Sequence, residues 1–285
     1  MKRKLIWALA LAVGLSLYSC DKEDDKVTTN DDDNKPEIVG LNGIVTGKKI
    51  SKSTIYFNEE IAPTDIYSYD YDTSNRLVTI NIQHWNYLRE ASNSKFHFRY
   101  KNNVLTQVDI EECNVVDTLI TISYENGKVI ETKYLKKSMC NGIPDYSYGR
   151  SRNFEYQGNY LKREIISHSD FDCTFTFTAD NLTKIIYNSS RAWEISIIEH
   201  DTQKNPYSNG LGILAYYSGV HILPVTDFYY YTLNVFYLSK NNPLKDVDGT
   251  IKCSYKYDTE GYPMEMEIIS KSGSLTLKTI NKIEY

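Results

Sequence analysis

The chain repeats a short pattern in which aromatic or branched residues alternate with polar ones, reach a turn, and continue into a second β-rich run. The first copy is Tyr67–Asp72, followed by the turn Thr73–Arg76 and the run Leu77–Ile82. Alternation with a period of two is typical of a half-buried strand. Each copy therefore predicts two neighbouring antiparallel strands.

Further copies follow at irregular intervals. The turn at Asn126-Gly127 is the clearest, since these residues accept the positive φ values that a tight hairpin needs. Other turns are expected at Lys101–Asn103, Gln157–Asn159, Ala179–Asn181 and Thr259–Gly261, with degenerate copies at His200–Asn205 and Leu238–Asn242. Eight turns imply about sixteen short strands in an up-and-down antiparallel meander, more than a flat open sheet tolerates. We predict an all-β fold that forms a strongly curved sheet or a partly closed barrel.

Residues 206–237 interrupt this pattern. Leu211–Val225 is apolar and contains Gly212, Gly219 and Pro224, and the aromatic run Phe228–Tyr231 follows. The period is ambiguous, so we predict a partly irregular or helical insertion. It either packs on an open face of the sheet as a second layer or forms a lid or ligand contact. Packing is favoured, because apolar runs usually belong to the core.

The N-terminus has the parts of a bacterial lipoprotein signal. Basic residues at 2–4 precede the apolar run Leu5–Leu17, and small Ser19 precedes Cys20. The apolar run is short for a membrane span. We predict a signal peptide over 1–19 and lipidation at Cys20, although Tyr18 stands where a lipobox usually has a small residue. The alternatives are an ordinary secretory signal with an incidental cysteine, or an uncleaved anchor helix.

An acidic segment follows the predicted lipid site. Between Asp21 and Glu37 there are eight acidic residues and three lysines, and no aromatic residue appears until Tyr56. This composition predicts a disordered tether over 20–37 and a single domain over 38–285. The domain is nearly balanced in charge, which argues against a nucleic-acid partner.

The turn repeat, the lipid site and the flanking sequences 204–206 and 239–243 resemble Bacteroidetes lipoproteins of unknown function with a porin-like antiparallel β fold. The resemblance covers the chain from about residue 50 to Tyr285 and implies no function. The acidic run after Cys20 resembles a surface-export signal, which implies a place on the outer face of the outer membrane. A weaker likeness to YD-type repeats, through Tyr71-Asp72 and Arg76-Leu77, lacks the regular glycines of those repeats.

Four cysteines remain beyond Cys20, and none forms a C-x-x-C pair, so a zinc or redox motif is unsupported. An even number in an exported domain favours disulfides. Counting outward from the Asn126-Gly127 turn places Cys113 and Cys140 at the same end of a hairpin, and we predict a disulfide between them. Cys173 and Cys253 are expected to be buried thiols.

No catalytic residue, metal site or cofactor is predicted. The five histidines are scattered, and the neighbours His168, Ser169 and Asp170 would point apart in a strand or turn. The motif Asp246-x-Asp248-Gly249 has too few oxygen ligands for calcium and predicts a turn.

The aromatic content, with 25 Tyr, 9 Phe and 3 Trp, is the one functional hint. Most of these residues should pack in the core or across strands. Those nearest to breaks in the repeat are candidate ligand-binding residues: Trp85, Trp193, Tyr229, Tyr230 and Tyr231. We favour a non-catalytic surface protein that binds a glycan, a peptide or a partner subunit. The alternative is a surface hydrolase acting on polysaccharide or peptide, with a site assembled only in the fold.

Overall fold

The computed structural model describes residues 41–285 apart from 59, 86–90, 136–148, 168–171, 189–192, 209, 219–236 and 273, and it leaves out the side chains of 193, 198 and 272. Residues 38–285 belong to one compact unit. The predicted signal peptide, Cys20 and tether lie outside the described residues and stay predictions.

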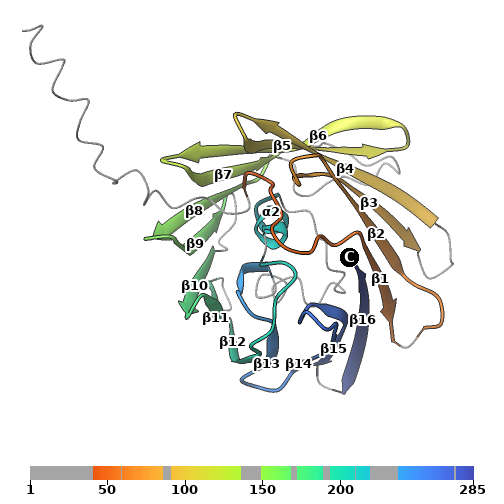
Figure 1. The fold of residues 1–285 in the computed structure, drawn as a ribbon. Helices are drawn as coiled ribbons and strands as arrows, with labels where there is room; N and C mark the ends of the chain where they lie inside the picture. The colour runs from red at the N-terminus through yellow and green to blue at the C-terminus, as the bar shows by residue number, and fades with distance from the viewer. Residues whose placement is uncertain are drawn as a thin grey trace, which may run out of the picture. The chain divides into compact units, whose positions relative to one another are not determined.

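The described residues contain sixteen antiparallel strands that form a closed barrel (Figure 1). Each strand pairs with its neighbours along the chain, and the first pairs with the last. The strands are β1 (Lys52–Phe57), β2 (Asp65–Tyr71), β3 (Leu77–Trp85), β4 (Ala91–Lys101), β5 (Val104–Glu112), β6 (Val115–Glu125), β7 (Lys128–Tyr134), β8 (Ser151–Gln157), β9 (Tyr160–Ile166), β10 (Asp172–Thr178), β11 (Asn181–Asn188), β12 (Trp193–His200), β13 (Pro243–Asp246), β14 (Ile251–Tyr257), β15 (Pro263–Ser272) and β16 (Leu275–Glu284). The predicted all-β meander is confirmed, and its sheet closes completely.

The repeated turns all lie at one end of this barrel, which we call the repeat-turn end. They connect β2 to β3, β4 to β5, β6 to β7, β8 to β9, β10 to β11 and β14 to β15. Asn126 and Gly127 have φ values of 49° and 74°, as the tight-turn prediction requires. The connections between the other strands lie at the opposite end, which we call the far end.

A repeated tyrosine contact explains much of the aromatic content. In six places a tyrosine near the repeat-turn end donates its hydroxyl to a backbone carbonyl on or just before the preceding strand, over 2.5 to 2.9 Å. The pairs are Tyr71–Ile50, Tyr100–Leu77, Tyr124–Leu105, Tyr156–Val129, Tyr255–Pro243 and Tyr285–Pro263. In the first four β-hairpins a shift of strand register falls just before the tyrosine. These rings pack against the core and so serve the fold.

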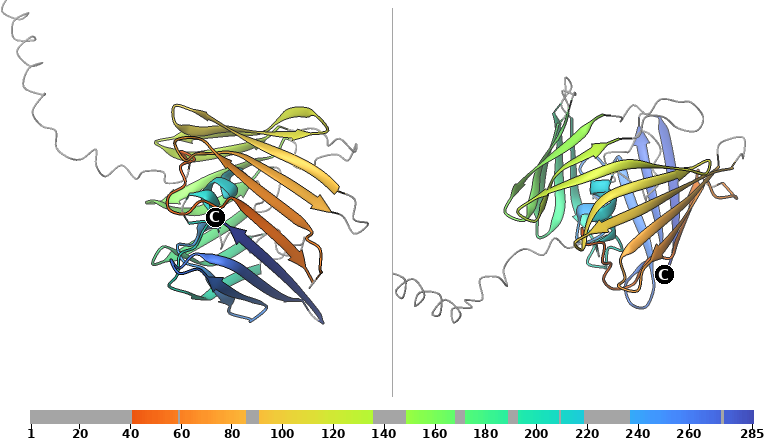
Figure 2. Two further views of the ribbon diagram at one scale, coloured as in Figure 1. Left: turned by 45° about the vertical axis from the view of Figure 1, so that its right-hand side comes forward. Right: turned by 90° about the horizontal axis from the view of Figure 1, so that it is seen from above.

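Apolar side chains line the lumen of the barrel, and a wall of sixteen strands cannot fill it by itself, because barrels of this size are wide enough for a channel. Two further segments occupy it. Residues 41–51 contribute Leu41, Val45 and Ile50 to the core. The insertion contributes Tyr207 and helix α2 (Leu211–Ser218), which lies inside the ring of strands (Figures 1 and 2).

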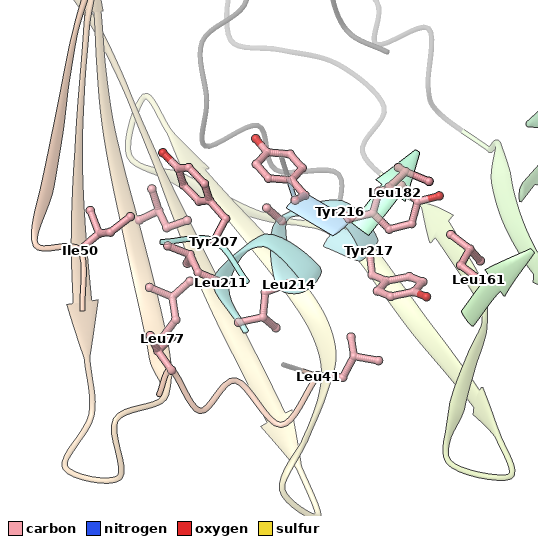
Figure 3. Packing of buried hydrophobic residues seen from close by; sticks show 14 of the residues in the cluster. Leu41, Ile50, Leu77, Leu161, Leu182, Tyr207, Leu211, Leu214, Tyr216 and Tyr217 are labelled. Atoms are coloured by element: carbon pink, nitrogen blue, oxygen red, sulfur yellow. The ribbon is translucent and has the colours of Figure 1, made fainter. Parts of the chain in front are cut away.

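The two segments pack on each other as well as on the wall. Leu211 and Leu214 lie beside Leu41 and Leu77, while Tyr216 and Tyr217 point toward the opposite wall (Figure 3). Nearly every residue of α2 is buried, which suits a helix that is apolar on all sides. A Cβ atom on Gly212 would come within 2.6 Å of the Tyr237 carbonyl oxygen, so only glycine fits there.

Two details differ from the sequence predictions. The degenerate copies at 200–205 and 238–242 are not two hairpins but the two sides of one neck, because β12 pairs directly with β13. Asp201 N donates to Asn242 O over 3.0 Å, and Asn205 Nδ2 donates to Ser239 O over 2.7 Å. The insertion does not cover an open sheet face, since the closed barrel has none. Its described residues pack inside the lumen, and residues 219–236 lie outside the described part.

Candidate functional site at the far end of the barrel

At the repeat-turn end, the chain that precedes β1 bonds to the barrel wall. Leu105 N donates to Leu41 O over 2.8 Å, Leu77 N donates to Gly43 O over 3.0 Å, and Val45 N donates to Asn75 O over 3.0 Å. A Cβ on Gly43 would collide with the Tyr100 hydroxyl, so the segment runs directly against the wall. These contacts attach residues 41–45 to the wall, so the described part of this segment has a structural role.

Lys48 fastens the same segment to the β14–β15 turn. Its Nζ lies 2.7 Å from Asp258 and 2.7 Å from Glu260, and over the ring of Tyr262. The hydrogen bond from Lys48 lowers the pKa of Asp258 to about 2, with help from the backbone N–H groups of Glu260 and Tyr262. We call residues 41–51 with these partners the N-terminal clasp.

A buried ion pair holds α2 in the lumen. Arg152 Nε donates to Glu164 Oε1 over 2.5 Å, and Arg152 Nη1 donates to the Tyr216 carbonyl over 2.7 Å. The Tyr216 hydroxyl donates to the second oxygen of Glu164 over 2.5 Å. Burial alone would lower the pKa of Arg152, but the adjacent Glu164 carboxylate holds it above its usual value. Arg152 and Glu164 thus both bond to Tyr216, so the cluster anchors the helix.

Two of the candidate residues lie within the described chain, and both are at the far end, on strands that are well separated around the barrel. Trp85 ends β3 and is half-buried, and Trp193 begins β12, so both strands place a tryptophan at this end. Tyr229, Tyr230 and Tyr231 lie outside the described residues. Among the described aromatic side chains, Tyr160 is the exposed one, and it lies at the repeat-turn end with its hydroxyl bonded to Asp180. A broad aromatic platform is therefore not found in the described surface.

A polar group on the lumen wall of the far end was not predicted. Asp65, His84 and Ser92 are register partners across β2, β3 and β4. They lie on the same faces of their strands as Tyr67, Ile82 and Phe96, which contact the core. His84 Nδ1 lies 2.6 Å from Asp65 Oδ1, the Asp65 side chain is 13% exposed, and the His84 ring is 52% exposed.

This group has a definite chemical capacity. A carboxylate on Nδ1 fixes the histidine ring and leaves Nε2 to accept a proton, as in a base beside a nucleophilic hydroxyl. Ser92 is exposed and is the cross-strand neighbour of His84, with Cβ atoms of such pairs about 4.5–5.5 Å apart. Counting outward from the turn Thr73–Arg76 already pairs 65 with 84, so the sequence held this signal. No turn motif in the sequence fixes the register of β4 against β3, so the position of Ser92 could not be predicted.

The cysteines have separate environments. Cys113 is exposed in the tight β5–β6 turn at the far end, where it and Asn114 have φ values of 49° and 62°. Cys140 lies outside the described residues, so the Cys113–Cys140 disulfide stays a prediction. Cys173 and Cys253 are buried, and burial raises the pKa of both thiols, that of Cys253 to about 12. Within the described residues, no group of three or more His, Cys, Asp or Glu side chains could hold a metal ion.

The outer face of the barrel carries charges on most of its strands. Arg163, Lys184 and Lys278 lie near the middles of β9, β11 and β16, with side chains 41%, 37% and 28% exposed. Cross-strand ion pairs run around the wall: Arg99–Asp109, Arg163–Asp172, Lys184–Glu194, Lys245–Glu199, Lys256–Glu265, Lys278–Glu267 and Lys52–Glu284. Alternation along each strand thus gives an apolar inner face and a charged outer face. Across the part of the chain that the structure describes, no helix has the length and apolar character needed to cross a membrane.

Comparison with known proteins identifies the fold. A porin-like protein from Bacteroides uniformis is similar over 83% of this chain and 98% of its own, with a TM-score of 0.52 and 12% sequence identity. A porin-like protein from Bacteroides vulgatus covers the same shares with a TM-score of 0.45 and 13% identity. The predicted resemblance to a porin-like β fold is therefore confirmed for the fold. No protein-family model matches the chain. No curated protein sequence matches it either.

Proposed function

We propose that this chain is a lipid-anchored protein of the bacterial outer membrane whose barrel lies in water and binds an extracellular glycan, peptide or partner subunit at its far end. The charged outer face is the observation that carries the proposal. A transmembrane barrel needs an apolar outer band about 25 Å tall, and each Arg or Lys near the bilayer midplane costs about 2–4 kcal/mol. Arg163, Lys184 and Lys278, near the middles of their strands, would make that position strongly unfavourable.

The filled lumen supports the same proposal. Residues 41–51 and α2 occupy the space that an open channel would need. Binding at the far end is supported by half-buried Trp85, because a tryptophan ring can stack on a sugar or insert into a partner's pocket, and Trp193 begins a strand at the same end.

The membrane part of the proposal is tested by Cys20→Ala in a chain whose residues 1–19 are replaced by an ordinary cleavable secretory signal, so that no uncleaved apolar segment remains. Wild type should partition into detergent with the membrane fraction, and the variant should be released as a monodisperse protein in detergent-free buffer. Cys113→Ala is the control and should fractionate like wild type. A Cys20→Ala barrel that stays in membranes and needs detergent would show that the barrel itself is embedded.

The binding part is tested with a glycan array and a peptide library applied to wild type, Trp85→Ala and Trp193→Ala. If a ligand binds at the far end, one of these variants should lose binding or bind it about tenfold or more weakly, as for other aromatic contact residues. Tyr160→Ala, at the opposite end, is the matched control. Equal binding by all four proteins would exclude a role for the far-end tryptophans in ligand binding.

A second candidate function, a serine hydrolase, is favoured by the Asp65–His84 contact with Ser92 opposite. In this reaction the Ser92 hydroxyl attacks an ester or amide carbonyl and its proton passes to His84. The leaving group takes that proton, and water then releases the acyl group. A fluorophosphonate probe should label Ser92 and fail to label Ser92→Ala, while Ser94→Ala should label normally. Absence of labelling on wild-type Ser92 would remove this function.

A further inference from the structure

We propose that the repeat-turn end of the barrel faces an anionic lipid surface, the one that holds the protein's own anchor, so that the far end points away from the membrane. The inference deepens the proposed function and rests on lipidation at Cys20. It assigns an interaction surface and its partner, and it decides which end of the barrel can meet a ligand.

The first support is where the chain enters the barrel. Leu41, the first described residue, pairs with Leu105 at the repeat-turn end, and Gly43 and Val45 continue along that end. The N-terminal clasp then holds the segment through Lys48 and Asp258, 2.7 Å apart. The described chain therefore begins at this end of the barrel.

The second support is the length of the connecting chain. Leu41 is 21 residues from Cys20. A flexible segment of that length spans about 25 Å on average, from about 5–6 Å times the square root of the residue number. The barrel wall is itself about 20–30 Å tall, given strands of this length and the usual tilt. The average span of the tether is thus comparable to one barrel height, so the anchor keeps the repeat-turn end close to the membrane.

The third support is the difference in charge between the two ends. Each end comprises the described residues of its connections and the strand residue that adjoins each connection. The repeat-turn end has eight basic and seven acidic side chains. The basic residues are Lys48, Lys49, Lys52, Arg76, Lys101, Lys128, Lys204 and Lys240, and the acidic ones are Asp72, Glu125, Asp180, Asp201, Asp258, Glu260 and Glu284.

The far end has one basic and six acidic side chains. The basic residue is Arg150, and the acidic ones are Glu60, Asp65, Glu112, Asp172, Asp246 and Asp248. The far-end connections outside the described residues add four basic and four acidic residues by sequence, so they leave this difference unchanged. An anionic surface attracts nearby basic side chains by about 1 kcal/mol each and repels acidic ones, so the far end is the less favourable side to present.

Native cysteines allow a direct test with the full-length lipidated protein in vesicles of phosphatidylcholine and phosphatidylglycerol. Cys20 carries the lipid, and burial raises the pKa of Cys173 and Cys253, which protects both from maleimide. Cys140→Ser then leaves exposed Cys113 as the far-end labelling site. Cys113→Ser with Cys140→Ser and Ser74→Cys gives the matched site at the repeat-turn end, in the exposed β2–β3 turn.

Energy transfer to an acceptor on the lipid headgroups should be about twice as efficient or more from position 74 as from position 113. The reason is that the far end lies one barrel height, about 20–30 Å, further from the membrane. Equal transfer from both positions, or stronger transfer from 113, would overturn the orientation. A protein that does not float with the vesicles, or that floats equally well as Cys20→Ala with residues 1–19 replaced by a cleavable secretory signal, would instead overturn the proposed lipid anchor.

Discussion

At the scale of single residues, the tyrosines divide by their partners. Those at the six repeated contacts donate a hydrogen bond to a backbone carbonyl and pack against the core, so they stabilise strand pairing. Burial raises the pKa of these phenols, that of Tyr156 to about 12, which keeps them protonated donors throughout the physiological range. Tyr160 differs because its ring is exposed and its hydroxyl meets Asp180.

Tyr100→Phe should therefore lower the free energy of unfolding by about 1–2 kcal/mol, because the Leu77 carbonyl loses its donor in a partly buried place. Tyr160→Phe removes an exposed hydroxyl and should change it by less than about 0.5 kcal/mol. Urea unfolding followed by circular dichroism measures both. Similar losses in the two variants would contradict a special role for the repeated contact.

The Lys48–Asp258 contact predicts a particular pH dependence. Its carboxyl has a pKa lowered to about 2 in the folded protein, against about 3.9 in an unfolded chain. A lowered pKa contributes stability above the unfolded value, and this contribution is lost as the pH falls toward 2. The difference in thermal midpoint between wild type and Asp258→Asn should thus be constant above about pH 5 and shrink between about pH 4 and 2. A difference that grows on acidification would show that the ionised Asp258 carboxylate does not stabilise the folded protein.

At the scale of elements, the strands follow the local pattern, whereas α2 depends on its surroundings. A helix of eight residues is too short to be stable alone, and this one is held by apolar packing and by the Arg152–Glu164 pair. The charges face each other only because β8 and β9 are neighbours in the barrel and α2 lies against them.

Arg152→Met should destabilise the protein by about 3–5 kcal/mol, because Glu164 is left buried without its partner. The double variant Arg152→Met/Glu164→Leu should recover a large part of this loss, since it removes both charges. Arg163→Met, which breaks an ion pair on the outer face, is the control and should cost about 1 kcal/mol or less. Chemical denaturation of wild type and the three variants measures the order of their stabilities. A double variant less stable than Arg152→Met would contradict the prediction.

At the scale of the whole molecule, closure and filling go together. The pairing of β1 with β16 joins Lys52 to Glu284 and removes both sheet edges. The same closure leaves an apolar lumen that the wall cannot fill, so the clasp and the insertion complete the core. One sheet thus presents a mainly apolar inner face and a charged outer face.

Replacing residues 206–238 by a short Gly/Ser link should expose this apolar lining while leaving β12 and β13 in place, because Asn205 and Ser239 are already in contact. We expect strong binding of a hydrophobic dye and loss of monomer in size-exclusion chromatography. Replacing residues 102–103 by Asn-Gly, in a tight turn at the repeat-turn end, is the control and should change neither. A monomeric, cooperatively unfolding deletion variant would show that the insertion is not part of the core.

The sequence by itself determined the local features of this protein. The alternation of Tyr67, Tyr69 and Tyr71 with polar residues, and turns such as Asn126-Gly127, identified strands and hairpins because both depend on neighbouring residues only. The expected strand count was correct even though two supposed turns form one neck. Counting across β6 and β7 drifts by one position where the register shifts between Ser123 and Tyr124, which no local signal announced.

The tertiary structure decided closure, the filling of the lumen and the meeting of distant polar groups. Nothing near Lys52 indicates Glu284, and nothing near Arg152 indicates Tyr216. Asp65, His84 and Ser92 come together only through the register of three strands. The physical reason is that local pattern fixes conformation and face, whereas long-range pairing and burial are settled by the whole chain at once, when the apolar faces must find each other.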